Sequence, residues 1–133
     1  MAPLTKNSGR TRVGDGRRFV DPLAADVRIF TGALVALNAQ GQALPAAPNA
    51  ARIRGVALHE ADNTDGMAGD VSVEIERGAF LFANSGTVTR AHIGGNVVVV
   101  DDNTVGPPPG SGTPLIAGKC LDVTPHGVVV EIL

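Results

Sequence analysis

The side chains best able to do chemistry in this chain are three histidines and one cysteine. His59, His92 and His126 are scattered, and none has a second histidine or a cysteine at metal-ligand spacing. We therefore expect each histidine at the surface or in a turn. Cys120 is the single cysteine, so no internal disulfide can form. Its apolar neighbours favour a small core residue over a nucleophile.

An acidic cluster at 60–66, Glu-Ala-Asp-Asn-Thr-Asp-Gly, resembles part of a calcium-binding loop. With Gly66 at the sixth position of such a loop, the first and twelfth positions fall on Ala61 and Ser72, so both carboxylate ligands are missing. A polar turn is the better interpretation. Asp101-Asp102-Asn103 is also interpreted as a turn. Adjacent residues at a strand end point to opposite faces, which is poor geometry for two carboxylates that share a reaction.

The segment Gly118-Lys119-Cys120 resembles the end of a phosphate-binding loop, but Thr113 and Cys120 occupy positions that require glycine and serine or threonine. The chain contains no nucleophile elbow and no zinc-protease motif. The sequence therefore predicts a protein without catalytic residues, metal or cofactor. An enzymatic site assembled between the chains of a small oligomeric β protein stays open as an alternative.

Charge is distributed unevenly along the 133 residues. Residues 1–18 contain one acid and five basic side chains, a net charge of +4, whereas the remainder contains twelve acids and six basic side chains, a net charge of −6. A basic arm on an acidic body suggests an electrostatic tether to a partner, either nucleic acid or an acidic protein surface, and a solvated tail is the alternative. The five candidate contact residues are Lys6, Arg10, Arg12, Arg17 and Arg18.

Composition narrows the class of protein further. The chain has no Trp or Tyr and only four Phe, so base stacking is scarce and sequence-specific nucleic-acid binding is not expected. No apolar run approaches the ~20 residues of a membrane span, and the N-terminus has no apolar segment typical of a secretory signal. A small aliphatic core favours self-association, with a dimer preferred and a trimer also possible, and a stable monomer is the alternative.

Short apolar runs separated by Gly, Pro, Asn and Asp predict an all-β fold, a jelly-roll-like sandwich or barrel. Residues 1–18 are expected to form a flexible arm, because they have little to bury, and 19–133 a single β domain. The clearest strand is 71–76, where apolar and polar residues alternate. Gly78 is expected to break or bulge the chain before a second strand. The other predicted strands are 27–30, 33–37, 53–58, 97–100, 115–123 and 128–132.

Irregular segments are also expected. Residues 43–51 and 106–114 are rich in proline and predict loops. Residues 124–127 predict a turn between the last two strands. Helix is limited to one turn, at 88–94.

Several segments of the sequence resemble segments of small head proteins that are encoded beside Mu-like and related major capsid proteins of tailed phages. They are the run from Val27 to Gly41, the segment 53–57, the central run Val71–Asn84 with its glycine and Phe-x-Phe unit, the segment 97–105, and the C-terminal 128–133. The resemblance covers roughly residues 13–133.

The resemblance implies a capsid cement, or decoration, protein. Such a protein would be made in the cytoplasm of a bacterial host, would lie on the capsid surface of the virion, and would bind the major capsid protein at junctions between its subunits. The resemblance implies no catalytic residues in this chain. A tail or baseplate component is a further alternative.

Overall fold

The computed structural model describes residues 2–10 and 12–133, and their regular structure is almost entirely β-strand. This confirms the prediction of an all-β fold of the sandwich or barrel kind, and the structure combines open sheets with a closed barrel. In chain order the elements are β1 (Arg18–Pro22), β2 (Arg28–Ile29), β3 (Leu34–Leu37), β4 (Ala43–Pro45), β5 (Arg52–Ala57), β6 (Ala61–Asp62), β7 (Ser72–Glu76), β8 (Gly78–Asn84), the 3₁₀ turn η1 (Arg90–His92), β9 (Asn96–Val99), β10 (Thr104–Gly106), β11 (Ile116–Thr124) and β12 (Gly127–Ile132).

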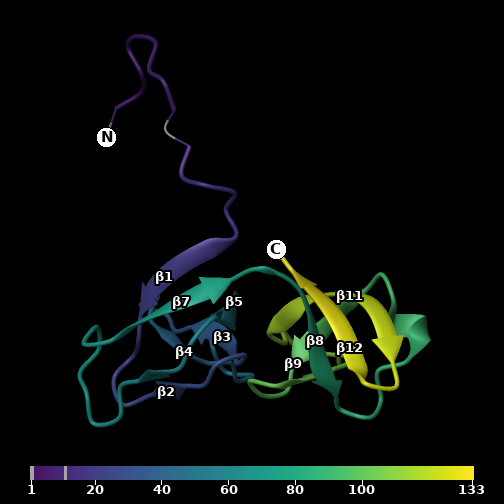
Figure 1. The fold of residues 1–133 in the computed structure, drawn as a ribbon. Coiled ribbons are helices and arrows are strands. Elements are labelled where there is room, and N and C mark those ends of the chain that lie inside the picture. Colours follow the sequence, from purple (N-terminus) through teal and green to yellow (C-terminus); the bar gives the residue numbers. More distant parts are fainter. Residues whose placement is uncertain (1, 11) are drawn as a thin grey trace.

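The N-terminal half forms a five-stranded sheet in the order β1-β7-β5-β3-β4, and all of its pairings are antiparallel. A single parallel bridge between Leu23 and Ala43 joins the two outer strands just beyond β1. The short ladder of β2 and β6 lies beside this sheet (Figure 1). The sheet is therefore strongly curved, with its concave side filled by side chains.

The C-terminal half is a closed barrel in the order β10-β8-β12-β11-β9, and β9 and β10 pair to close it. Only β8 and β10 run parallel. Closure leaves this unit without a free strand edge, which removes the usual route to edge-to-edge aggregation. The turn predicted at 124–127 joins β11 to β12, as expected.

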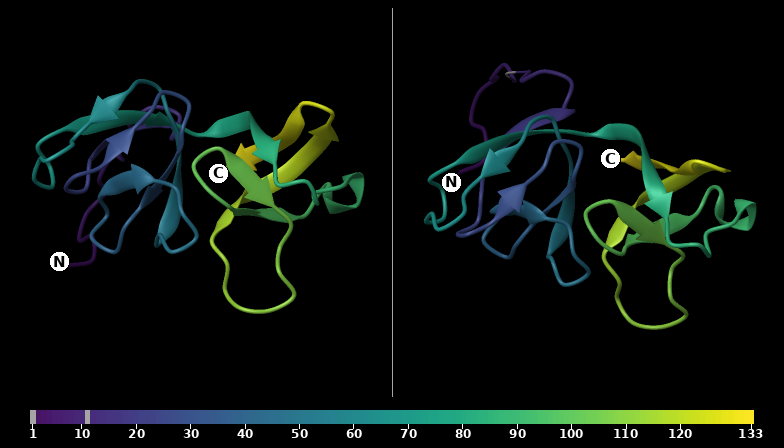
Figure 2. Two further views of the ribbon diagram at one scale, coloured as in Figure 1. Left: turned by 90° about the horizontal axis from the view of Figure 1, so that it is seen from below. Right: turned by 60° about the horizontal axis from the view of Figure 1, so that its bottom comes forward.

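One residue, Arg77, separates β7 of the sheet from β8 of the barrel. Figure 2 shows the chain crossing from one unit to the other along this connection. Gly78 has a backbone φ of 150°, a value that residues other than glycine rarely adopt. The sequence prediction of a special backbone at Gly78, between two strands, is confirmed.

Apolar side chains gather into two clusters, and β3 contributes to both. Leu34 and Ala36 pack with the valines of the barrel, whereas Val35 and Leu37 pack inside the curved sheet. All four residues of β3 are buried. This strand is therefore covered on both faces and lies between the two clusters, one inside the curved sheet and one between the sheet and the barrel.

Several strand predictions are confirmed, whereas β1, β4 and the short strands β6 and β10 were not predicted. The alternation in β7 buries Val73 and Ile75 and exposes Ser72 and Glu74, as predicted. The loop predicted for 43–51 was wrong at its start, because β4 forms there along the edge of the sheet, where proline is tolerated.

Residues 2–10 of the arm contain no strand or helix, and all of them are exposed. The arm extends away from the sheet in Figure 1. Strand β1 begins at Arg18, the last residue of the predicted arm. Within the described residues there is no helix of the length and apolarity that a membrane span requires.

Candidate interaction surface

The basic side chains of the arm fall into an outer and an inner group. Lys6 and Arg10 belong to the outer group, and neither forms an ion pair or side-chain hydrogen bond with the residues that the structure describes. Arg12 folds back locally, because its Nη2 donates to Oδ1 of Asp15 at 3.0 Å while both side chains stay largely exposed. Lys6 and Arg10 are therefore available to a partner, and Arg12 becomes available when its exposed pair with Asp15 opens.

The inner group, Arg17 and Arg18, lies against the body of the molecule. The carbonyl of Arg17 accepts a hydrogen bond from the backbone N–H of Arg77 at 2.7 Å. Arg18 opens β1, and its Nε lies 3.9 Å from Oε1 of Glu76 on β7. The structure thus separates the five predicted contact residues into three that project and two that mark where the arm joins the sheet.

An ion pair secures the strand that holds the arm. Nε of Arg54 on β5 donates to Oδ2 of Asp21 on β1 at 2.7 Å, and Nη2 lies 3.3 Å from Oδ1. The side chains of Arg54 and Asp21 are only 22% and 12% exposed. A bidentate pair in such a sheltered place is stronger and more specific than a surface pair.

Aromatic stacking reinforces the same strand. The guanidinium carbon of Arg54 lies 3.7 Å from the ring centroid of Phe19, and that of Arg77 lies 5.1 Å away. Arg77 also donates from Nε to the carbonyl oxygen of Arg54 at 3.2 Å. Both distances to the ring suit cation–π attraction. The root of the arm is therefore fixed by Phe19, Asp21, Arg54 and Arg77, which we call the anchor cluster.

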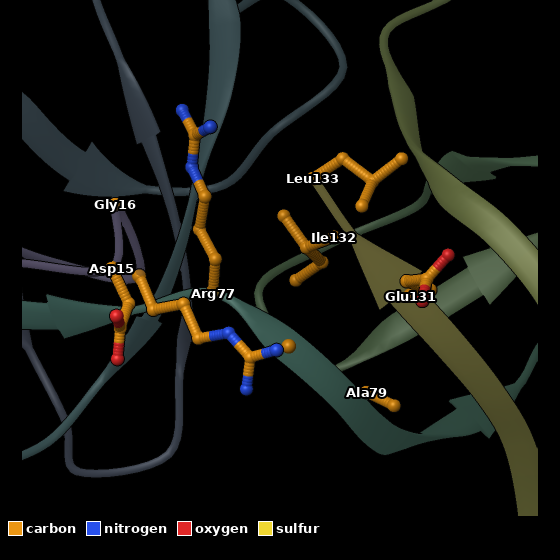
Figure 3. Close-up of a pocket in the computed structure, with 9 residues that line it drawn as sticks. Asp15, Gly16, Arg77, Ala79, Glu131, Ile132 and Leu133 are labelled. Carbon is orange, nitrogen blue, oxygen red and sulfur yellow. The ribbon is translucent and has the colours of Figure 1, made fainter.

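A cleft of about 420 Å³ opens beside the anchor cluster, between the root of the arm and the C-terminal end of β12. Arg77, Asp15, Glu131 and Leu133 contribute to its lining. Figure 3 shows Arg77 extending away from Glu131 and Ala79 rather than across the cleft. The mixture of opposite charges in this lining gives it no clear preference for an anion or a cation.

The other candidate reactive groups are dispersed or buried. Cys120 is fully buried, and burial raises the pKa of its thiol, so the prediction of a core residue is confirmed. His59 accepts from the backbone N–H of Glu74 at 3.1 Å, and His92 completes a capping box with Thr89 at η1. In the described part of the chain no three His, Cys, Asp or Glu residues converge on a possible metal position.

The acidic segment 60–66 forms β6 and a turn, as predicted for a polar connection. Hydrogen bonds from the hydroxyl and the backbone N–H of Thr64 lower the pKa of Asp62. The side-chain amide of Asn63 is buried and donates to the carbonyls of Ala24 and Met67. These contacts fix the turn from within.

The sequence did not identify the anchor cluster. One feature of the sequence could have indicated it: the charged residue Arg54 lies in a predicted strand, close to the apolar residues Ile53 and Val56. Such a residue needs a counter-charge if it points inward. Its partner, Asp21, lies 33 residues away, so no local pattern connects the two.

A search for related proteins found no matching family model, no similar curated protein and no similar solved structure.

Proposed function

We propose that this protein is a structural component of a tailed-phage virion, a cement protein that binds the outside of the capsid and stabilises contacts between major capsid subunits. It acts by binding, without catalysis. The observation that supports this most directly is the arm: exposed cations project from an anchored strand on an otherwise acidic body.

The anchor cluster explains how such an arm can be useful. An extended segment loses conformational entropy when it docks, so its attachment point should not add further disorder. The ion pair between Arg54 and Asp21, and the stacking on Phe19, hold β1 firmly to the sheet. Because the base of the arm is fixed, the arm can reach only a limited volume around it. Its effective concentration near a neighbouring site within that volume is therefore higher.

The outer cations suit carboxylates on a partner. Arginine forms planar bidentate pairs with carboxylates, and the exposed side chains of Arg10 and Arg12 are free to do so once Arg12 leaves Asp15. The closed barrel and the short outer strands of the sheet also suit a protein that must remain folded at high local density.

Capsid sedimentation tests the proposal. Purified protein, and a variant lacking residues 2–12, should be incubated with undecorated capsids at low and high salt, and the bound fraction measured in the pellet. We expect the intact protein to bind, the shortened protein to bind more weakly while keeping its β circular dichroism, and salt to weaken binding of the intact form.

The controls separate the alternatives. A variant in which Lys6, Arg10 and Arg12 become glutamine keeps the length of the arm and removes its three outer cations, so it should behave like the deletion. Failure of the intact protein to bind capsids at low salt would refute the proposal. Binding to purified tails would instead favour a tail or baseplate component, and a tightly bound metabolite would favour an oligomeric enzyme.

A further inference from the structure

A shallow groove of about 220 Å³ lies where the loop before β3 meets the loop between β9 and β10. Its lining residues are Phe30, Thr31, Gly32, Ala33, Asp102 and Asn103. Phe30 is 54% exposed, although the other three phenylalanines are buried or half-buried. A chain with few aromatic side chains thus leaves one of them on its surface, and aromatic side chains, Phe among them, are enriched in the cores of protein interfaces.

Asp102 supplies an uncompensated charge to the same groove. Its carboxylate has no cationic partner within 4.0 Å among residues 2–10 and 12–133. Burial and the neighbouring charge of Asp101 raise its pKa. The fold therefore holds a half-buried carboxylate beside an exposed ring without neutralising it, and a bound cation would relieve that cost.

The groove is held in place by both halves of the molecule. The carbonyl of Asp102 accepts from the N–H of Leu34 on β3 at 2.7 Å, and the carbonyl of Asn103 accepts from the N–H of Ala83 on β8 at 2.9 Å. Because the sheet and the barrel each bind this loop, little ordering remains to be done when a ligand arrives.

The chain itself shows which ligand suits this pair of side chains. In the anchor cluster, a phenylalanine and an aspartate together hold an arginine, with Arg54 stacked on Phe19 and paired with Asp21. At the groove, the ring of Phe30 already has the guanidinium of Arg28 4.9 Å from its centroid. Glu60 binds Arg28, however, so that cation is not available to Asp102.

We propose that the groove between Phe30 and Asp102 receives an arginine from the N-terminal arm of a second copy of this protein, with Arg10 as the foremost candidate. Charge complementarity supports this occupant, because the arm carries +4 and the body −6. Arg10 is exposed and has no partner among the described residues.

The placement of the arm favours another copy over its own body. In Figure 1 the arm leaves the sheet on the side opposite β2, the strand that immediately precedes Phe30. A contact from the arm of one copy to the groove of another can be exchanged reciprocally within a two-fold dimer, or it can repeat head to tail in a ring or a chain. This inference does not depend on capsid binding, although such links would tie neighbouring cement proteins together on a shell.

Mixing two full-length variants tests the inference. Sedimentation velocity at low salt should show self-association of the unaltered protein, and Arg10→Ala or Asp102→Asn should each weaken it by roughly tenfold or more, the loss expected for a charge-assisted hydrogen bond. An equal mixture of the two variants should associate again in pairs, because one supplies an intact groove and the other an intact arm.

Matched controls make the result specific. Asp65→Asn removes the same charge from an exposed loop position outside the groove and should leave association unchanged. Arg10→Lys keeps the charge but loses the planar guanidinium, so it should fall between the unaltered protein and Arg10→Ala. Thermal melting should show that all variants are folded.

Three results would overturn the inference: an unaltered protein that stays monomeric at the highest soluble concentration, equal effects of Asp65→Asn and Asp102→Asn, or a mixture of folded variants that does not associate. Capsid sedimentation of the same samples keeps the two proposals distinct. Protein that coats capsids yet never self-associates retains the cement function and loses this inference.

Discussion

Replacing Arg54 with alanine should loosen the strand that carries the arm. The substitution removes both hydrogen bonds to the carboxylate of Asp21 and the stacking on Phe19. It also leaves the Asp21 carboxylate, whose side chain is only 12% exposed, without its counter-charge. An uncompensated charge in a sheltered position costs more than the loss of an exposed pair.

The magnitude follows from these contacts. Hydrogen bonds to charged groups contribute about 1.5–3 kcal/mol, and a cation–π contact contributes about 0.5–1 kcal/mol at a partly exposed site. Water still reaches about a fifth of the Arg54 side chain, which is 22% exposed, so we expect a total loss of about 2–4 kcal/mol rather than the larger cost of a fully buried pair.

Urea denaturation followed by circular dichroism measures this loss, and amide hydrogen exchange locates it. Exchange in β1 should accelerate more than exchange in the barrel, because β1 is an outer strand and, among the described strands, forms a ladder with β7 alone. Arg90→Ala is the matched control. Its pair with Asp122 has a similar distance of 3.1 Å, but the two side chains are 74% and 49% exposed, so about 0–1 kcal/mol is expected.

Equal losses for Arg54→Ala and Arg90→Ala would refute the argument from burial. A second check is the double variant Asp21→Asn with Arg54→Met, in which no charge is left unpaired. It should recover part of the stability that Arg54→Ala loses, because removing both partners avoids the desolvation cost.

Three further outcomes are expected. Gly118→Ala should lower the free energy of unfolding by about 1–3 kcal/mol, because the new Cβ would lie 2.3 Å from the carbonyl oxygen of Glu131, whereas Gly110→Ala, with no atom within 4 Å, should have little effect in the same denaturation assay. Gly78→Val should cost about 1–3 kcal/mol because of its φ of 150°, and an unchanged midpoint would show that the backbone adapts. Asp102→Asn should raise the melting temperature at neutral pH, because the raised pKa of Asp102 means that its ionised carboxylate destabilises the fold. The stability of the unaltered protein should rise as the pH falls through the folded-state pKa of Asp102. The difference in melting temperature between the variant and the unaltered protein should therefore disappear at low pH.

Local sequence patterns were sufficient to predict most of the strands. Alternation of apolar and polar residues indicated the strand now seen as β7, and the run of valines from Val97 indicated a strand buried on both faces, as in β9. These patterns are readable because the two faces of a strand differ in burial with a period of two residues. The pattern failed for β1, whose short polar and apolar run gives no clear strand signal, and for β4, where proline suggested a loop. It also missed the short strands β6 and β10, which lie beside predicted turns.

The sequence by itself determined the all-β class, the special backbone at Gly78, the core position of Cys120 and the contrast between a basic arm and an acidic body. Only the tertiary structure shows which strands pair and that the second half closes into a barrel. It alone also shows that Arg54 contacts both Asp21 and Phe19. It also brought Phe30 next to Asp102, which lies 72 residues further along the chain by their numbering. The physical reason is that the alternation of buried and exposed residues is a property of a single strand. Strand pairing and side-chain contacts depend instead on how segments that are distant in the sequence pack together in one core.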